Sequence, residues 1–82
     1  MKRSLDTLQP GDCALVREVI CQGPMRRRLR DIGFTADTTV TCLGRSPLGD
    51  PTAYAVKGAV LALRREDAAT ILVDDGRDTT WD

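Results

Sequence analysis

Turn-forming residues interrupt this chain so often that none of its helices or strands can be long. Glycine or proline stands at positions 10, 11, 23, 24, 33, 44, 47, 49, 51 and 58. Several segments between these positions are rich in the β-branched and apolar residues that favour strands. This pattern predicts a mainly β fold, a small β-barrel of about five strands with one inserted short α-helix. A sheet of this size has to close or be covered, because open edges pair between molecules.

Five segments carry the strand signal. The first, residues 13–21, follows Pro10-Gly11, which fits the two central positions of a type II turn. Within this segment we expect Ala14, Val16 and Ile20 to share one face. The remaining expected elements are strands over residues 38–44, 53–57, 59–63 and 70–73, a hairpin turn at Lys57-Gly58, and one helical turn over residues 65–69.

The inserted helix is predicted over residues 24–32. Gly23 can serve as its N-cap, Pro24 suits the first helical position, and Gly33 suits the C-terminal cap. One apolar stripe follows the helical repeat and is expected to face the core. It consists of Met25, Leu29 and Ile32.

Composition excludes several classes of protein. The 82 residues carry 12 basic and 12 acidic side chains and are 41% hydrophobic, which does not fit a disordered chain. The longest apolar run, residues 59–63, is too short to span a membrane, and the N-terminus has no apolar signal segment. We therefore expect a cytoplasmic protein that does not insert into a membrane, with one domain over residues 1–73 and an acidic tail over residues 74–82.

The sequence offers little support for catalysis or for a tight metal site. Histidine is absent, and no motif places a base beside a nucleophile, so we expect no enzyme and no required cofactor. Cys13, Cys21 and Cys42 lack zinc-ligand spacing and are expected to be buried thiols; a redox or thiolate-metal role is the alternative. Weak divalent binding is conceivable only at Asp74 and Asp75. A neutral chain with three aromatic residues also argues against a nucleic-acid partner.

A run of arginines on the predicted helix is the most unusual local feature. Arg26, Arg27 and Arg28 lie near its N-terminal end, where the helix dipole disfavours cations, and Arg30 repeats the charge of Arg26 one turn later. Asp31 is expected to offset part of this charge by pairing with Arg27 or Arg28. The run is either a solvated helix face or a contact surface for an acidic partner, because local rules are broken most often at functional sites.

The ordered features resemble the FeoA family, the small ferrous iron transport protein A. The residues that carry the resemblance are Leu5 and Leu8 with Pro10-Gly11-Asp12, Ala14-x-Val16, Arg28-Leu29-x-x-Ile32-Gly33-Phe34, Val40, Pro47-Leu48-Gly49-Asp50-Pro51, Gly58, Ala62-Leu63-Arg64 and Ala68-x-x-Ile71-x-Val73. One departure is Ala36-Asp37, where the family usually has Pro-Gly. Asp tolerates the left-handed conformation better than most residues, so we expect this turn to survive.

The resemblance implies an SH3-like barrel with a helical insertion and no catalytic role. It further implies a regulatory accessory that contacts FeoB, a membrane permease with a cytosolic GTP-binding domain. We expect that contact at Arg26, Arg27 and Arg30, with the Leu48 loop beside them. The alternative is a metal-sensing regulatory domain, because the same domain type occurs at the C-terminus of iron-dependent repressors. The oligomeric state stays open.

Overall fold

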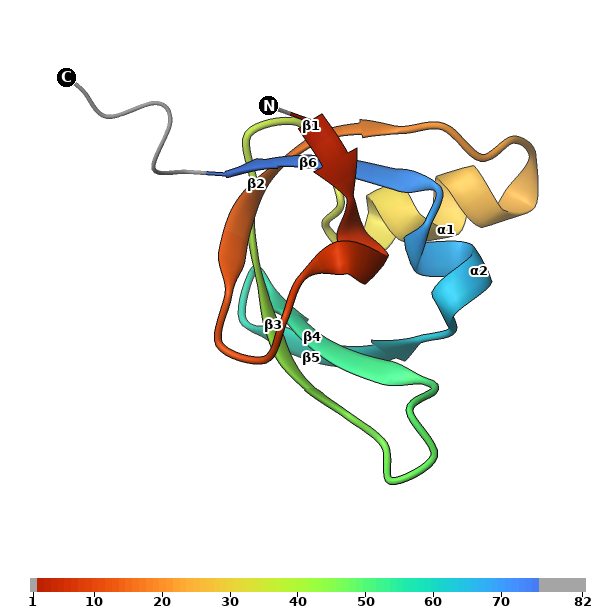
Figure 1. The fold of residues 1–82 in the computed structure, drawn as a ribbon. Helices are drawn as coiled ribbons and strands as arrows, with labels where there is room; N and C mark the ends of the chain where they lie inside the picture. The colour runs from red at the N-terminus through yellow and green to blue at the C-terminus, as the bar shows by residue number, and fades with distance from the viewer. Residues whose placement is uncertain (1, 76–82) are drawn as a thin grey trace, which may run out of the picture.

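A computed structural model describes residues 2–75 of the chain. Six strands wrap around one core, and two short helices cover one side of the barrel (Figure 1). The elements are β1 (Lys2–Ser4), the 3-10 helix η1 (Leu5–Thr7), β2 (Cys13–Val19), α1 (Pro24–Ile32), β3 (Thr39–Arg45), β4 (Thr52–Val56), β5 (Ala59–Leu63), α2 (Arg65–Ala68) and β6 (Ile71–Asp75). The predicted mainly β fold with an inserted short helix is confirmed.

All neighbouring strands are antiparallel, in the order β1-β6-β2-β3-β4-β5. β1 was not predicted, because it has only three residues and its partner β6 lies at the opposite end of the described chain. β6 runs to Asp75, two residues further than the predicted strand, so the first two residues of the predicted tail belong to the sheet. The rest of that tail, residues 76–82, lies outside the described residues.

Two predicted turns form as expected. At the first, the Asp12 backbone N–H donates to the Gln9 carbonyl (2.9 Å), and Gly11 has a φ of 94°. At the second, Lys57 and Gly58 have φ angles of 49° and 80°, and two positive φ angles are the signature of a type I′ hairpin turn. This turn pairs β4 with β5 from Val56 opposite Ala59 onward.

A bulge in β2 changes which side chains reach the core. The pairing of β2 with β6 shifts register between Val16 and Glu18. The extra residue moves Val19 into the core, at 8% exposure, and leaves Ile20 47% exposed just beyond the strand. The prediction that Ile20 shares a face with Ala14 and Val16 was therefore wrong, because strict alternation does not survive a bulge.

The core is apolar and draws on nearly every element. Its buried members are Leu5, Leu8, Ala14, Val16, Val19, Leu29, Phe34, Val40, Cys42, Tyr54, Val56, Leu63, Ala68, Ile71 and Val73. Cys42 is buried as predicted, but Cys13 is exposed and Cys21 half-buried, so burial of all three thiols was wrong. No helix within residues 2–75 is long and apolar enough to cross a membrane.

Candidate functional site

Helix α1 begins and ends where the sequence predicts. Pro24 lies in its first turn, and Gly23 precedes it with a φ of 73° but offers no side-chain cap. At the other end, the Gly33 N–H donates to the Leu29 and Arg30 carbonyls (3.2 and 3.1 Å). Leu29 is fully buried, and Met25 and Ile32 pack against the core, so the predicted apolar stripe is confirmed. The barrel therefore holds α1 by one face and leaves its other faces to solvent.

The solvent faces of α1 carry a dense positive charge. Arg26, Arg27, Arg28 and Arg30 are all exposed, and none forms an ion pair with any residue in the described range 2–75. The first turn also has no acidic residue to complement the helix dipole. We call these four residues the arginine face. The dipole disfavours the guanidinium groups near the N-terminal end and favours only Arg30, which lies in the last turn, and no described neighbour pairs with any of the four, so folding alone does not explain why they cluster here.

The expected pairing of Asp31 with Arg27 or Arg28 was wrong. Both side chains are exposed, and no ion pair joins either of them to Asp31 within the described part of the chain. Two physical reasons account for this. An acid placed C-terminal to its basic partner is the less favourable order on a helix, and exposed pairs gain little over hydration.

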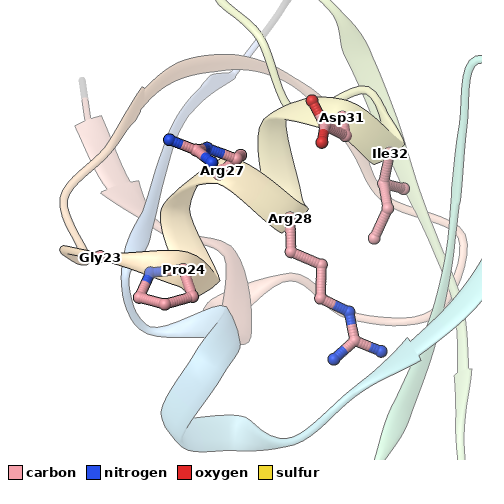
Figure 2. Close-up of a pocket in the computed structure, with 6 residues that line it drawn as sticks. All are labelled: Gly23, Pro24, Arg27, Arg28, Asp31 and Ile32. Carbon is pink, nitrogen blue, oxygen red and sulfur yellow. The ribbon is translucent and has the colours of Figure 1, made fainter.

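Shallow hollows flank α1 on both sides. One is lined by Gly23, Pro24, Arg27, Arg28, Asp31 and Ile32 (Figure 2). Arg27 and Arg28 leave the helix in different directions there, and Arg28 extends toward α2. The second hollow is lined by Gln22, Gly23, Arg26, Arg27, Arg30, Asp31 and Thr35. Arg27 therefore borders both hollows.

Leu48 does not lie with the arginine face. It is 94% exposed in the β3–β4 loop, at the rim of a separate hollow beside α2. The Asp50 carboxylate fixes this loop, because its Oδ1 accepts a hydrogen bond (2.8 Å) from the backbone N–H of Arg65 at the start of α2. The expectation that the Leu48 loop lies beside α1 was wrong. This bond and the β3–β4 hairpin hold the loop at the N-terminal end of α2, which points away from α1 (Figure 1).

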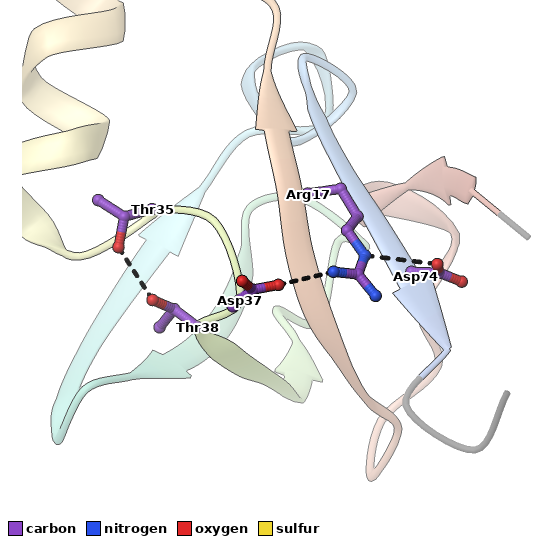
Figure 3. Close-up of polar contacts among 5 residues, drawn as sticks. All are labelled: Arg17, Thr35, Asp37, Thr38 and Asp74. Carbon is purple, nitrogen blue, oxygen red and sulfur yellow. Dashed lines mark hydrogen bonds and ion pairs between the residues drawn. The ribbon is translucent and has the colours of Figure 1, made fainter. Parts of the chain in front are cut away.

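The sequence did not predict a set of polar contacts around Arg17 on the other side of the barrel. The Arg17 guanidinium contacts Asp37 (Nη1 to Oδ1, 2.6 Å) and Asp74 (Nε to Oδ2, 3.4 Å), as Figure 3 shows. These contacts join β2 to the α1–β3 turn and to β6. Asp37 has a φ of 68°, so the turn adopts the left-handed conformation expected at this departure from the family pattern. The feature of the sequence that could have indicated these contacts is a charged residue, Arg17, inside the otherwise largely apolar strand CALVREV.

Asp74 therefore has an ion-pair partner, and the Asp75 side chain lies outside the described residues. Within residues 2–75, no group of three or more Cys, Asp or Glu side chains could hold a metal ion.

Burial raises the pKa of the Cys42 thiol, which keeps it protonated and unreactive.

Comparison with known proteins places these features in a family. A family model described as the FeoA domain matches residues 3–75. An Fe(2+) transport protein A/Fe(2+) transporter FeoB fusion protein from Porphyromonas gingivalis is 39% identical over 70 residues. That match covers 85% of this chain but only 8% of the fusion protein.

Two solved structures share the fold. Zinc-complexed FeoA from Stenotrophomonas maltophilia, described as an SH3 domain protein, superposes with a TM-score of 0.78 at 29% identity, over 87% of this chain and 88% of that one. A manganese-dependent transcriptional repressor superposes with a TM-score of 0.78 at 25% identity, over 90% of this chain and 41% of the repressor. The likeness to the SH3 domain protein confirms the predicted SH3-like barrel.

Proposed function

This chain belongs to the FeoA family, which is associated with ferrous iron transport, and from this premise we propose that it is an accessory of a FeoB-type GTPase-permease. In this proposal the chain acts by contact with the transporter's cytosolic domains and catalyses no reaction. The observation that carries the proposal is the fusion protein, because a segment 39% identical to this chain is joined there to the transporter FeoB in one polypeptide. Joining two domains keeps them at a high effective concentration, which favours a contact between them.

The arginine face is the surface we assign to this contact. Its four guanidinium groups are exposed and have no ion-pair partner among residues 2–75, so an acidic partner can pair with them without breaking an existing bond. Arginine also forms bidentate hydrogen bonds with carboxylates, which gives such a contact directional specificity. Leu29 is buried in the core and anchors α1 on the barrel, so the guanidinium groups project from a fixed element.

The test is a double charge reversal, Arg26→Glu with Arg30→Glu. We expect this variant to lose most of its co-purification with a FeoB-type transporter and to lower ferrous iron uptake in cells. The matched control is Lys2→Glu with Arg3→Glu, which makes the same change in net charge at exposed positions of β1. Equal co-purification of the two variants with the transporter would remove the arginine face from the proposal.

A metal-responsive regulatory domain is the second candidate function. The observations that favour it are the likeness to part of a manganese-dependent repressor and the zinc complex of a related FeoA. Calorimetry with ferrous, manganese and zinc ions separates the two candidates. The accessory function predicts binding no tighter than millimolar, and micromolar affinity for any of the three ions would favour metal sensing.

A further inference from the structure

The hollow beside α2 carries the opposite charge to the arginine face. Its lining residues are Asp6, Leu48, Gly49, Asp50, Arg65, Glu66 and Ala69, and we call it the Leu48 hollow. Three carboxylates face one guanidinium group there. The Oδ1 atom of Asp6 is buried and accepts no hydrogen bond from residues 2–75. Leu48 adds a nearly fully exposed apolar side chain at the rim.

Helix α1, which carries the arginine face, lies on the same side of the barrel as the Leu48 hollow. In the view of Figure 1, α1, α2 and the β3–β4 loop follow one another down that side, with α2 between the other two. Figure 2 also places α2 next to α1, with Arg28 extending toward it. One side of the molecule is therefore positive at one end and negative at the other, while the net charge of the whole chain is zero.

We propose that this side is a dimer interface, in which the arginine face of each copy docks on the Leu48 hollow of a second copy. A two-fold axis near α2 turns the positive end of one copy toward the negative end of the other, so both contacts form at once. Isologous two-fold dimers are the commonest protein oligomers, and they need one self-complementary patch of this kind. The exposed Leu48 side chain then has an apolar environment against the stem of an arginine or against Pro24.

Charge complementarity selects a second copy as the occupant of the hollow. The arginine face has four cations against Asp31, and the Leu48 hollow has three acids against Arg65. Each surface thus carries an excess that the other neutralises. Guanidinium groups that dock in the hollow replace the water around its carboxylates with charge-assisted hydrogen bonds, which avoids the cost of burying unpaired charge.

The dimer has a regulatory consequence that rests on the proposed function. The arginine face cannot contact a second chain and the transporter together, so the dimer is a closed form and the monomer is the form that docks. Screening by salt favours the monomer, because both contacts depend on exposed charges.

The test uses two complementary charge reversals in the whole chain. One variant is Arg26→Glu with Arg30→Glu, which makes the arginine face acidic. The other is Glu66→Arg with Ala69→Lys, which makes the Leu48 hollow basic while leaving the Asp50 bond to α2 intact. All four positions are exposed, so both variants are expected to keep the far-UV circular dichroism of the wild type. The control variants are Lys2→Glu with Arg3→Glu, and Glu18→Arg, at exposed positions of β1 and β2.

Sedimentation velocity at low and high ionic strength is the measurement. We expect the wild type and both controls to dimerise at low salt, and each interface variant alone to raise the dimer dissociation constant at least about tenfold. A 1:1 mixture of the two interface variants restores the dimer, because each reversed surface then meets its opposite. A wild type that stays monomeric, a mixture that stays monomeric, or open-ended assemblies in place of dimers would overturn the proposal.

Co-purification with the transporter separates this inference from the proposed function. The Glu66→Arg with Ala69→Lys variant keeps the arginine face and is expected to co-purify at least as well as the wild type. A wild type that is monomeric yet co-purifies through the arginine face refutes the dimer alone. A dimer that forms as described while the arginine-face variant still co-purifies refutes the transporter surface alone.

Discussion

Replacing Gly33 with alanine tests what holds α1 on the barrel. Gly33 follows the helix with a φ of 137°, a region that residues with a Cβ rarely adopt. A Cβ built there would lie 3.2 Å from Lys57 Cδ and 3.4 Å from Lys57 Cγ. Two effects therefore compete to explain the cost of the substitution, namely backbone strain at Gly33 and crowding by the Lys57 side chain.

Backbone strain is expected to dominate. Residues held in sparsely populated φ/ψ regions cost about 1–3 kcal/mol. The Lys57 contact involves a flexible side chain, and the hydrogen bond of its Nζ to Thr35 Oγ1 is long (3.4 Å), so displacing it costs about 0.5–1.5 kcal/mol even if it leaves its preferred rotamer. We therefore expect Gly33→Ala to lower the free energy of unfolding by about 2 kcal/mol. A domain of this length has about 4–12 kcal/mol in total.

The assay is urea unfolding followed by far-UV circular dichroism, where a loss of about 2 kcal/mol lowers the midpoint by about 1–2 M. Gly33→Ala is measured alone and together with Lys57→Ala. Because strain resides in the backbone, the loss should be the same in both backgrounds to within about 0.5 kcal/mol. Gly49→Ala is the matched control, since Gly49 has a φ of 89° and a Cβ there would meet nothing within 4 Å.

Two results would refute this reasoning. If the loss from Gly33→Ala disappears in the Lys57→Ala background, crowding and not φ determines the cost. If Gly33→Ala lowers stability by less than about 0.5 kcal/mol while Gly49→Ala lowers it by more than 1 kcal/mol, the helix end relaxes into another cap without strain.

Three further predictions concern packing, charge and thiol reactivity. Leu29→Ala leaves a cavity under α1 and should cost about 2–5 kcal/mol in urea unfolding; a loss below 1 kcal/mol would mean that the helix does not seal the core. A double-mutant cycle of Arg17→Ala and Asp37→Ala should give a coupling of about 0.2–1 kcal/mol that falls as salt is added, and a salt-independent coupling would contradict an exposed ion pair. In the native protein a maleimide should label Cys13 promptly and Cys42 only after unfolding, because burial raises the pKa of the Cys42 thiol; prompt labelling of both would show that β3 opens.

Local signals were sufficient to predict α1 and the turns. Pro24 and Gly33 set the bounds of the helix to the residue, because both act through their own backbone angles. The hairpin at Lys57-Gly58 follows for the same reason. Where a conformation depends on a residue and its immediate neighbours, the sequence carries the information.

Features that depend on the pairing of distant strands could not be predicted from the sequence. The β2 bulge exists because β6 pairs with β2 in a shifted register, so no inspection of residues 13–21 alone reveals that Val19 turns inward. Arg17 likewise finds its partners 20 and 57 residues away, at Asp37 and Asp74. Each of these features is a property of two chain segments brought together by the barrel.

The same difference between local and long-range information applies to the candidate site, of which only the part on α1 could be predicted. The exposure of Arg26, Arg27 and Arg30 follows from their spacing relative to the apolar stripe, and all three lie on one helix. The position of Leu48 depends on where a loop between two strands points, which the Asp50 hydrogen bond to α2 decides. Helical spacing therefore identified the arginine face but could not place the loop relative to it.

The pairing of β1 with β6 bears on how this domain forms in the cell. Lys2 lies opposite Asp74 and Ser4 opposite Leu72, so β1 cannot pair with β6 until β6 has emerged from the ribosome. Closure over almost the whole chain is entropically costly, and barrels of this topology fold in milliseconds to seconds, far slower than helical bundles. The pairing of β1 with β6 therefore cannot form before residues 72–74 have been translated, whereas the β4–β5 hairpin can form earlier.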